Sequence, residues 1–100
     1  MVSIADFIDV ALYTVKRIEI NDKVNFKTFK KDREVEIEKI DKGLFNVSEN
    51  GFHREVFLNL DEKDLKRTLK YLQKKEFPKS NKLWYKIIRT KKLKYDLNII

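Results

Sequence analysis

The pattern of hydrophobic and polar positions changes its period between Phe52 and Lys75, and the change divides this stretch into two predicted elements. Up to Leu60, hydrophobic and polar residues alternate, which is typical of a strand that buries one face. From Asp61 onwards the leucines recur at helical spacing, and Asp61 itself is a good N-cap residue. We therefore predict a strand that runs directly into a helix. The residues predicted to share the buried face of the strand are Phe52, Arg54, Val56, Leu58 and Leu60.

The polar side of this predicted helix is strongly cationic. Projected at roughly 100° per residue, its basic residues occupy one sector of about 100°, opposite the leucines. No acidic residue follows Asp64 until Glu76, so the sector is uniformly positive. A lysine-rich helix face is most often simply solvated, but it also suits contact with a polyanion. The basic residues of the sector are Lys63, Lys66, Arg67, Lys70 and Lys74.

The residues before Phe52 predict a helix followed by short strands. Hydrophobic residues recur at helical spacing from Ile4 to Val15, which indicates a helix from about residue 3 to 16. Polar turns separate the segments that follow, and Asn50-Gly51 suits a type I′ hairpin turn. Turns this short between successive strands predict an antiparallel sheet. The expected strands before the Phe52 strand cover residues 17–20, 24–30, 34–40 and 44–47.

The sequence after Pro78 predicts a second C-terminal helix. Proline ends the preceding helix, and Ser80 or Asn81 can cap a new one that runs to about Lys92. The alternating residues from Leu93 onwards suggest a closing edge strand. The predicted helix has an apolar face of Leu83, Trp84, Ile87 and Ile88, with Trp84 in the core, and an opposite face of Lys82, Lys86 and Arg89, which Tyr85 borders.

These elements predict one small α+β domain that spans residues 1–100. An N-terminal helix is followed by an antiparallel sheet of about four strands, and two C-terminal helices pack on the sheet. One hundred residues suffice for one domain with a modest core, and 42% hydrophobic residues are too many for a disordered chain. Frequent Lys, Glu and Ile with few Ala and Gly are typical of thermophile proteins, although an AT-rich genome produces the same bias.

Composition argues against most kinds of catalysis. Without cysteine there are no disulfides or thiolate metal sites, and a single histidine, His53, argues against a histidine-based metal centre or nucleophile. The chain has no glycine-rich phosphate loop. No hydrophobic run approaches the ~18 residues that cross a membrane, and no secretory signal is recognisable, so we expect a cytoplasmic protein without membrane contact.

Two acidic patterns have both a chemical and a structural interpretation. Glu34, Glu36 and Glu38 share one face of a predicted strand, where they would form either a carboxylate metal site or a solvated face. Asp61-Glu62-Lys63 has the acid-x-Lys form of one nuclease class, but Asp61 is accounted for as a helix cap. The structural interpretation is simpler in both cases. We therefore expect no enzyme, no catalytic residue, no metal and no cofactor.

The positive charge is concentrated in the last forty residues. The net charge is +7, and from Asp61 onwards thirteen Lys and Arg face five Asp and Glu. Lysine outnumbers arginine, which favours contact with phosphates over the reading of bases. Aromatic residues lie among the cations, and either Phe26 or Phe29 is expected to be free for stacking, since the other must face the core. The interleaved C-terminal rings are Tyr71, Trp84, Tyr85 and Tyr95.

The leading hypothesis is nucleic-acid binding with low sequence specificity and a slight preference for single strands, DNA or RNA. The alternative is a protein-interaction module, either an accessory subunit or a small viral or mobile-element protein, that docks its basic face on an acidic partner. Neither hypothesis fixes the oligomeric state, and a homodimer is open. The predicted binding residues are Lys63, Lys66, Arg67, Lys70, Lys74, Lys82, Tyr85, Lys86 and Arg89.

Residues 17–75 resemble the transcriptional coactivator/Whirly-type single-stranded DNA-binding fold. The resemblance lies in a run of antiparallel strands before a helix and in an R-x-x-x-L-x-L-[DE] junction formed by Arg54, Leu58, Leu60 and Asp61. It implies dimerisation through the helix and DNA on the curved face of the sheet, whereas the cations of this chain lie on the predicted helices. A helix-turn-helix over residues 62–91 is a further interpretation, which Pro78 and the long connector suit poorly.

Overall fold

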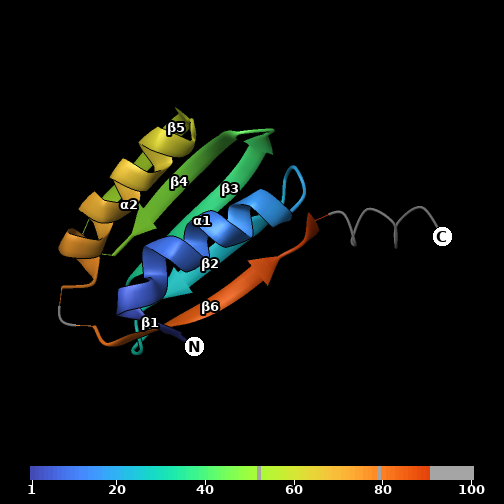
Figure 1. Ribbon diagram of the computed structural model, residues 1–100. Helices are drawn as coiled ribbons and strands as arrows, with labels where there is room; N and C mark the ends of the chain where they lie inside the picture. The colour runs from blue at the N-terminus through green and yellow to red at the C-terminus, as the bar shows by residue number, and fades with distance from the viewer. Residues whose placement is uncertain (52, 79, 91–100) are drawn as a thin grey trace.

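The computed structural model describes residues 1–51, 53–78 and 80–90, and within them two helices cover one face of a six-stranded antiparallel sheet (Figure 1). The α+β class is therefore confirmed. The strand order is β1-β6-β2-β3-β4-β5. The helices are the short 3-10 helix η1 (Ile4–Asp6), α1 (Phe7–Arg17) and α2 (Glu62–Glu76). The strands are β1 (Val2–Ser3), β2 (Lys23–Lys27), β3 (Glu34–Asp41), β4 (Leu44–Asn50), β5 (Arg54–Leu60) and β6 (Lys82–Ile88).

The prediction of two C-terminal helices and about four strands is wrong. Only α2 forms among the described C-terminal residues, and residues 82–88 form β6, which pairs with β2 and β1. The apolar residues of this segment fit a helical stripe, but they also fit a strand, because Leu83, Tyr85 and Ile87 alternate with Lys82 and Lys86. The edge of β2 that faces away from β3 offers backbone hydrogen bonds along its whole length, and pairing with this edge makes the segment a strand. The tail from Leu93 lies outside the described residues.

The connection between α1 and β2 also differs from the prediction. No strand forms at residues 17–20, because α1 continues to Arg17 and the chain then turns, with Asn21 at a φ of 79°. The Lys39 ammonium donates to the carbonyl oxygens of Lys16 and Ile18, at 3.4 and 3.0 Å. A cation at this position satisfies carbonyl groups that the end of a helix leaves without partners.

The turn between β4 and β5 is not the predicted type I′ hairpin. β4 ends at Asn50 and β5 begins at Arg54, and neither Asn50 nor Gly51 has the positive φ that a type I′ turn requires. Gly51 is needed for space instead, since a Cβ there would lie 2.1 Å from the Glu76 carboxylate. The tight turn with a positive φ lies between β3 and β4, where Gly43 has a φ of 72°.

A β-bulge in β5 reverses the predicted burial of that strand. Val47 pairs with Phe57 but Phe45 pairs with Leu60, so β5 contains one extra residue, and Asn59 has a φ of 57°. Phe57 and Leu60 consequently both pack against the core. The expected buried face is confirmed at Leu60 but wrong at Val56 and Leu58, which are 66% and 60% exposed.

The hydrophobic core lies between the helices and the sheet. α1 packs on β2 and β3, and α2 packs on β4 and β5 (Figure 1). The ring of Phe7 meets Phe26 and Phe77 edge-on, with centroids 4.9 and 5.5 Å apart. Each such side chain stabilises the fold by roughly 1.5 to 3 kcal/mol when buried. No described helix covers the opposite face of the sheet, called here the open face. Among the described helices, none is long and apolar enough to cross a membrane.

The buried side chain of Asp22 ties the end of β6 to the α1–β2 connection. Its carboxylate accepts hydrogen bonds from the backbone N–H groups of Glu19 (3.0 Å) and Thr90 (3.1 Å). The Arg89 guanidinium lies 4.0 Å from the same carboxylate. Residues almost seventy positions apart are thus joined through one side chain, which fixes where β6 ends.

We expect Asp22→Ala to lower the free energy of unfolding by roughly 2 to 4 kcal/mol, because two backbone donors lose a charged acceptor. Urea denaturation followed by circular dichroism measures the change. Asp41→Ala is the matched control: Asp41 is exposed and accepts only from the N–H of Lys42, so its loss should cost less than about 1 kcal/mol. Equal losses in the two variants would contradict the role of Asp22.

Candidate functional site

The structure divides the predicted cationic residues between two surfaces. One set lines the outer side of α2 and is exposed. Lys82 and Lys86 instead lie on β6, where they point to the open face because Leu83 and Tyr85 point to the core. The single basic face expected from the sequence therefore does not form. The residues of the first set, called here the α2 ridge, are Lys63, Lys66, Arg67, Lys70 and Lys74.

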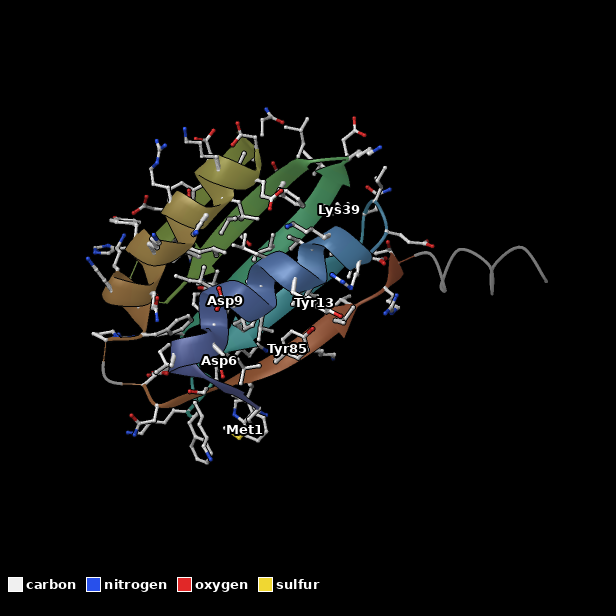
Figure 2. The ribbon with its side chains drawn as sticks, viewed as in Figure 1. Met1, Asp6, Asp9, Tyr13, Lys39 and Tyr85 are labelled. Carbon is white, nitrogen blue, oxygen red and sulfur yellow. The ribbon has the colours of Figure 1, made fainter. Side chains whose placement is uncertain are left out.

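Tyr85 and Arg89 lie apart from both surfaces. Tyr85 rises from β6 towards α1, and its hydroxyl is 2.7 Å from the hydroxyl of Thr14 (Figure 2). Its ring is 5.4 Å from the buried ring of Phe26. Arg89 lies next to Asp22 at the end of β6. Tyr85 is half-buried beneath α1, Arg89 is exposed beside Asp22, and Tyr95 is outside the described residues.

Two aromatic rings are exposed together on the open face. Phe29, in the loop between β2 and β3, stacks on Trp84 of β6 with ring centroids 5.8 Å apart and planes 18° apart. The Trp84 indole N–H donates to the carbonyl oxygen of Phe29 at 3.1 Å, which holds the loop to the strand. The ring of Phe29 is 68% exposed and that of Trp84 38%. The expectation of a buried Trp84 is wrong. The expectation that one of Phe26 and Phe29 faces the core and the other is exposed is confirmed, since Phe26 is buried and Phe29 is exposed.

Lysines surround this pair of rings. Lys82 and Lys86 lie two residues before and after Trp84 on the same face of β6. Lys27 is the partner of Trp84 in the β2–β6 register, and the Lys31 ammonium lies 5.3 Å from the centre of the indole ring. Lys82 and Lys86 form no ion pair with another described residue. The pair of rings and the lysines around it, called here the platform, are Phe29, Trp84, Lys27, Lys31, Lys82 and Lys86.

The carboxylates of β3 lie beside the platform but are engaged. The side-chain amide of Asn25 donates to Glu34 (3.2 Å) and to Glu36 (2.9 Å). Glu34 also lies 3.6 Å from Lys27, and Glu36 lies 3.7 Å from Lys23. Within the described ranges no group of such residues is arranged to hold a metal ion. The acidic row is thus paired with the lysines of β2, whereas Lys82 and Lys86 of β6 form no ion pair with another described residue.

A groove adjoins the platform at the end of the sheet. It encloses ≈ 820 Å³ between the β2–β3 loop, the C-terminal end of α2 and the segment before β6, and it shares Phe29 and Lys82 with the platform. Its wall carries charges of both signs, from Lys30 and Arg33 and from Asp32 and Glu76. The hydroxyl of Thr28 donates to Asp32 at 2.6 Å, and this hydrogen bond lowers the pKa of the Asp32 carboxyl.

Two carboxylates are buried where α2 ends. Glu49 of β4 and Glu76 of α2 are almost fully buried, and one carboxylate oxygen of Glu49 has no hydrogen-bond partner among the described residues. Burial and the neighbouring Glu76 charge raise the pKa of Glu49. The Lys75 ammonium lies 3.4 Å from Glu49 and also contacts Glu55, and the bond to Glu55 raises the pKa of Lys75. This cluster fixes the end of α2 to the sheet.

Sequence reasoning found the cations of the α2 ridge and a possible stacking ring at Phe29 among lysines, but it placed Trp84 and its neighbouring lysines on a helix. Phe29 was identified as a residue that could be free, yet its partner Trp84 was assigned to a helix. The usable signal was the alternation of Lys82, Trp84 and Lys86 with apolar residues, which a strand places on one face. Lys27 and Lys31 flank Phe29 in the sequence and were expected near a free ring, but their relation to Trp84 depends on the pairing of β2 with β6.

Comparisons of the chain with protein-family models, with curated proteins and with solved structures find no match. The resemblance of residues 17–75 to the Whirly-type fold therefore stays a prediction. The function has to be argued from the geometry of the two cationic surfaces.

The raised pKa of Glu49 predicts how stability depends on pH. Between the ordinary pKa of 4.5 and the raised value, the folded chain binds more protons than the unfolded chain, so stability falls as pH rises. Glu49→Gln replaces the titrating carboxyl group with an amide, which binds no proton in this pH range. The free energy of unfolding of the variant, relative to that of the unmodified protein, should therefore increase as the pH rises above 4.5.

Urea titrations at several pH values measure this difference. Glu38→Gln, which removes a carboxylate from the open face instead, is the control. Parallel pH profiles for Glu49→Gln and the unmodified protein would contradict the interpretation.

Proposed function

We propose that the protein binds single-stranded nucleic acid on the platform. The observation that carries the proposal is the exposed, nearly parallel stack of Phe29 and Trp84 within a group of lysines. Large exposed rings forgo the stabilisation that burial provides, and a base that stacks on them restores it. Stacking of one base on an aromatic side chain contributes about 1 to 3 kcal/mol.

The lysines of the platform are placed to hold the sugar-phosphate backbone. Lys82 and Lys86 lie roughly 7 Å from Trp84 in either direction along β6, since a strand rises by about 3.3 Å per residue. A base stacked on the rings thus has a cation on each side of its backbone. Lys31 extends the positive surface towards the loop, while Lys27 lies beside Trp84 and is paired with Glu34 at 3.6 Å. Neutralisation of phosphates by these cations makes the binding strongly dependent on salt.

The same geometry supports low sequence specificity and a preference for single strands. Every base has an aromatic face, so stacking tolerates any sequence. Lysine acts as a point charge, and the platform has no arginine fork to read the edge of a base. In a duplex the bases are stacked on one another, and the rings of Phe29 and Trp84 would have no free base to contact. An acidic protein partner would be attracted by the lysines but would gain nothing comparable from the rings.

The ring pair can be tested through Trp84, the single tryptophan of the chain. We expect a single-stranded oligonucleotide to quench tryptophan fluorescence at low salt, and Phe29→Ala to weaken binding about tenfold, because half of the stacking surface is lost. Tyr13→Ala is the matched control, since Tyr13 is an exposed ring on α1, outside the platform (Figure 2). Absence of binding at low salt would refute the proposed function, and unchanged affinity in Phe29→Ala would refute the ring pair as its site.

The salt dependence tests the phosphate contacts. Each phosphate contact that a single strand makes contributes about −0.7 to the slope of log K against log salt concentration. Lys86→Gln should therefore make the slope shallower by about 0.7, measured by fluorescence anisotropy between roughly 50 and 200 mM salt. Lys42→Gln removes an exposed lysine from the distant β3–β4 turn and should leave the slope unchanged. Equal effects of the two substitutions would mean that only the net charge of the protein matters.

A further inference from the structure

We infer that the α2 ridge is a second binding surface, which holds the backbone of a nucleic-acid duplex while the platform holds a single strand. The preferred ligand is then a duplex with a single-stranded extension. The inference rests on the proposed function of the platform and adds the class of substrate. It is carried by the composition of the ridge, by its separation from the platform and by the groove between them.

The ridge is a straight row of cations with few local partners. Lys63, Lys66, Lys70 and Lys74 are exposed and form no ion pair with another described residue, and Arg67 lies 4.0 Å from Asp64. From the first to the last of these lysines the row measures about 16 Å, at 1.5 Å per residue. Duplex DNA carries about one charge per 1.7 Å of its axis. A rigid row of this length therefore lies along several phosphates.

The ridge has no pair of stacked rings, which distinguishes it from the platform, although Tyr71 beside it is 49% exposed. Tyr71 is the single aromatic residue of α2, and it faces β5, where its ring meets Phe57 edge-on at 6.4 Å. The Tyr71 hydroxyl also accepts a hydrogen bond from Lys75 at 3.1 Å. The ridge residues are all cations, and the one ring beside them is engaged with Phe57 and Lys75. A row of cations suits a regular double-stranded backbone, whose bases are already stacked, better than a single strand.

The two surfaces are too far apart for one straight backbone to contact both. α2 packs over β4 and β5 on the helix side of the sheet, whereas Trp84 lies on β6 on the open face (Figure 1). With β2 and β3 in between, the lateral separation alone is roughly 15 Å at about 4.8 Å per strand. The ligand must therefore pass around an edge of the sheet.

The groove at the end of the sheet provides that path. Phe29 and Lys82 form its platform side, and Glu76 and Pro78 form its side at the end of α2. Lys30 and Arg33 line the wall between them, and Arg33 is held in place by a hydrogen bond of 3.1 Å to the carbonyl oxygen of Glu76. A strand that leaves a duplex on the ridge thus reaches the platform through a passage in which the three cations Lys30, Arg33 and Lys82 outnumber the acids Asp32 and Glu76. This connection makes one ligand with a duplex part and a single-stranded part the best match.

The test compares three ligands in fluorescence anisotropy: a single strand, a blunt duplex, and a duplex that carries the same single strand as an extension. Two linked contacts raise affinity by an effective concentration, so the extended duplex should bind at least about tenfold more tightly than the single strand. Lys66→Gln combined with Lys70→Gln should abolish most of this gain and change single-strand affinity by less than about twofold. Arg17→Gln combined with Lys42→Gln removes the same charge elsewhere and should preserve the gain. Circular dichroism and thermal melting confirm that each variant is folded.

Each of the other outcomes overturns either the inference, the proposed function together with it, or the assignment of the ridge to a duplex. If the extended duplex binds no more tightly than the single strand, the inference fails while the proposed function stands. If the single strand does not bind but the duplex does, the proposed function fails, and the inference fails with it. If the ridge variant loses as much affinity for the single strand as for the extended duplex, the two surfaces are not separate and the inference fails. A competition measurement compares poly-glutamate with an unlabelled duplex at equal concentration of negative charge. If both competitors remove the gain in affinity equally well, the ridge fits an acidic protein as well as a duplex, and its assignment to a duplex is overturned.

Discussion

The structure depends on one constraint: both helices bury their apolar sides against the same face of the sheet. Every central strand must therefore send alternate residues towards α1 and α2, and the residues between them are left on the open face. Phe26 and Leu83 fill the core for this reason, while Lys27 and Trp84 lie outside. The candidate site is thus a consequence of packing on the opposite side of the sheet. A substitution that shifted the register of β6 by one residue would bury lysines and dismantle the platform in the same step.

Much of the fold could be predicted from local sequence patterns. α1, the strands from β2 to β5 and α2 follow from period and turn signals, and the carboxylate of Asp61 caps α2 by accepting from the N–H of Asp64 at 2.7 Å. β6 could not be predicted in this way, because its apolar residues fit both periods and only the edge of β2 decides between them. The prediction of which β5 residues are buried failed for a different reason. A single extra residue at Asn59 changes the parity within the strand, and no composition signal announces it.

The candidate site was predictable in its chemistry but not in its geometry. The excess of cations after Asp61 is evident from the sequence, and those on α2 do lie on one side of a helix. Their relation to Lys82 and Lys86 depends on the path of the chain, which leaves α2 at one side of the sheet and returns along β6 near the other. Two neighbouring segments of similar composition therefore end on opposite layers. The ring pair adds a contact between a loop and a strand fifty-five residues apart, which no local pattern encodes.

The bulge in β5 has a consequence beyond the core. β5 is the outermost strand on its side of the described sheet, and it exposes Val56 and Leu58. A regular edge with such side chains is a template on which identical chains can extend the sheet into fibres. The extra residue at Asn59 interrupts the row of backbone donors and acceptors and twists the edge away from an incoming strand. The residue that sets the parity of the core thus also makes this edge a poorer template for a second chain.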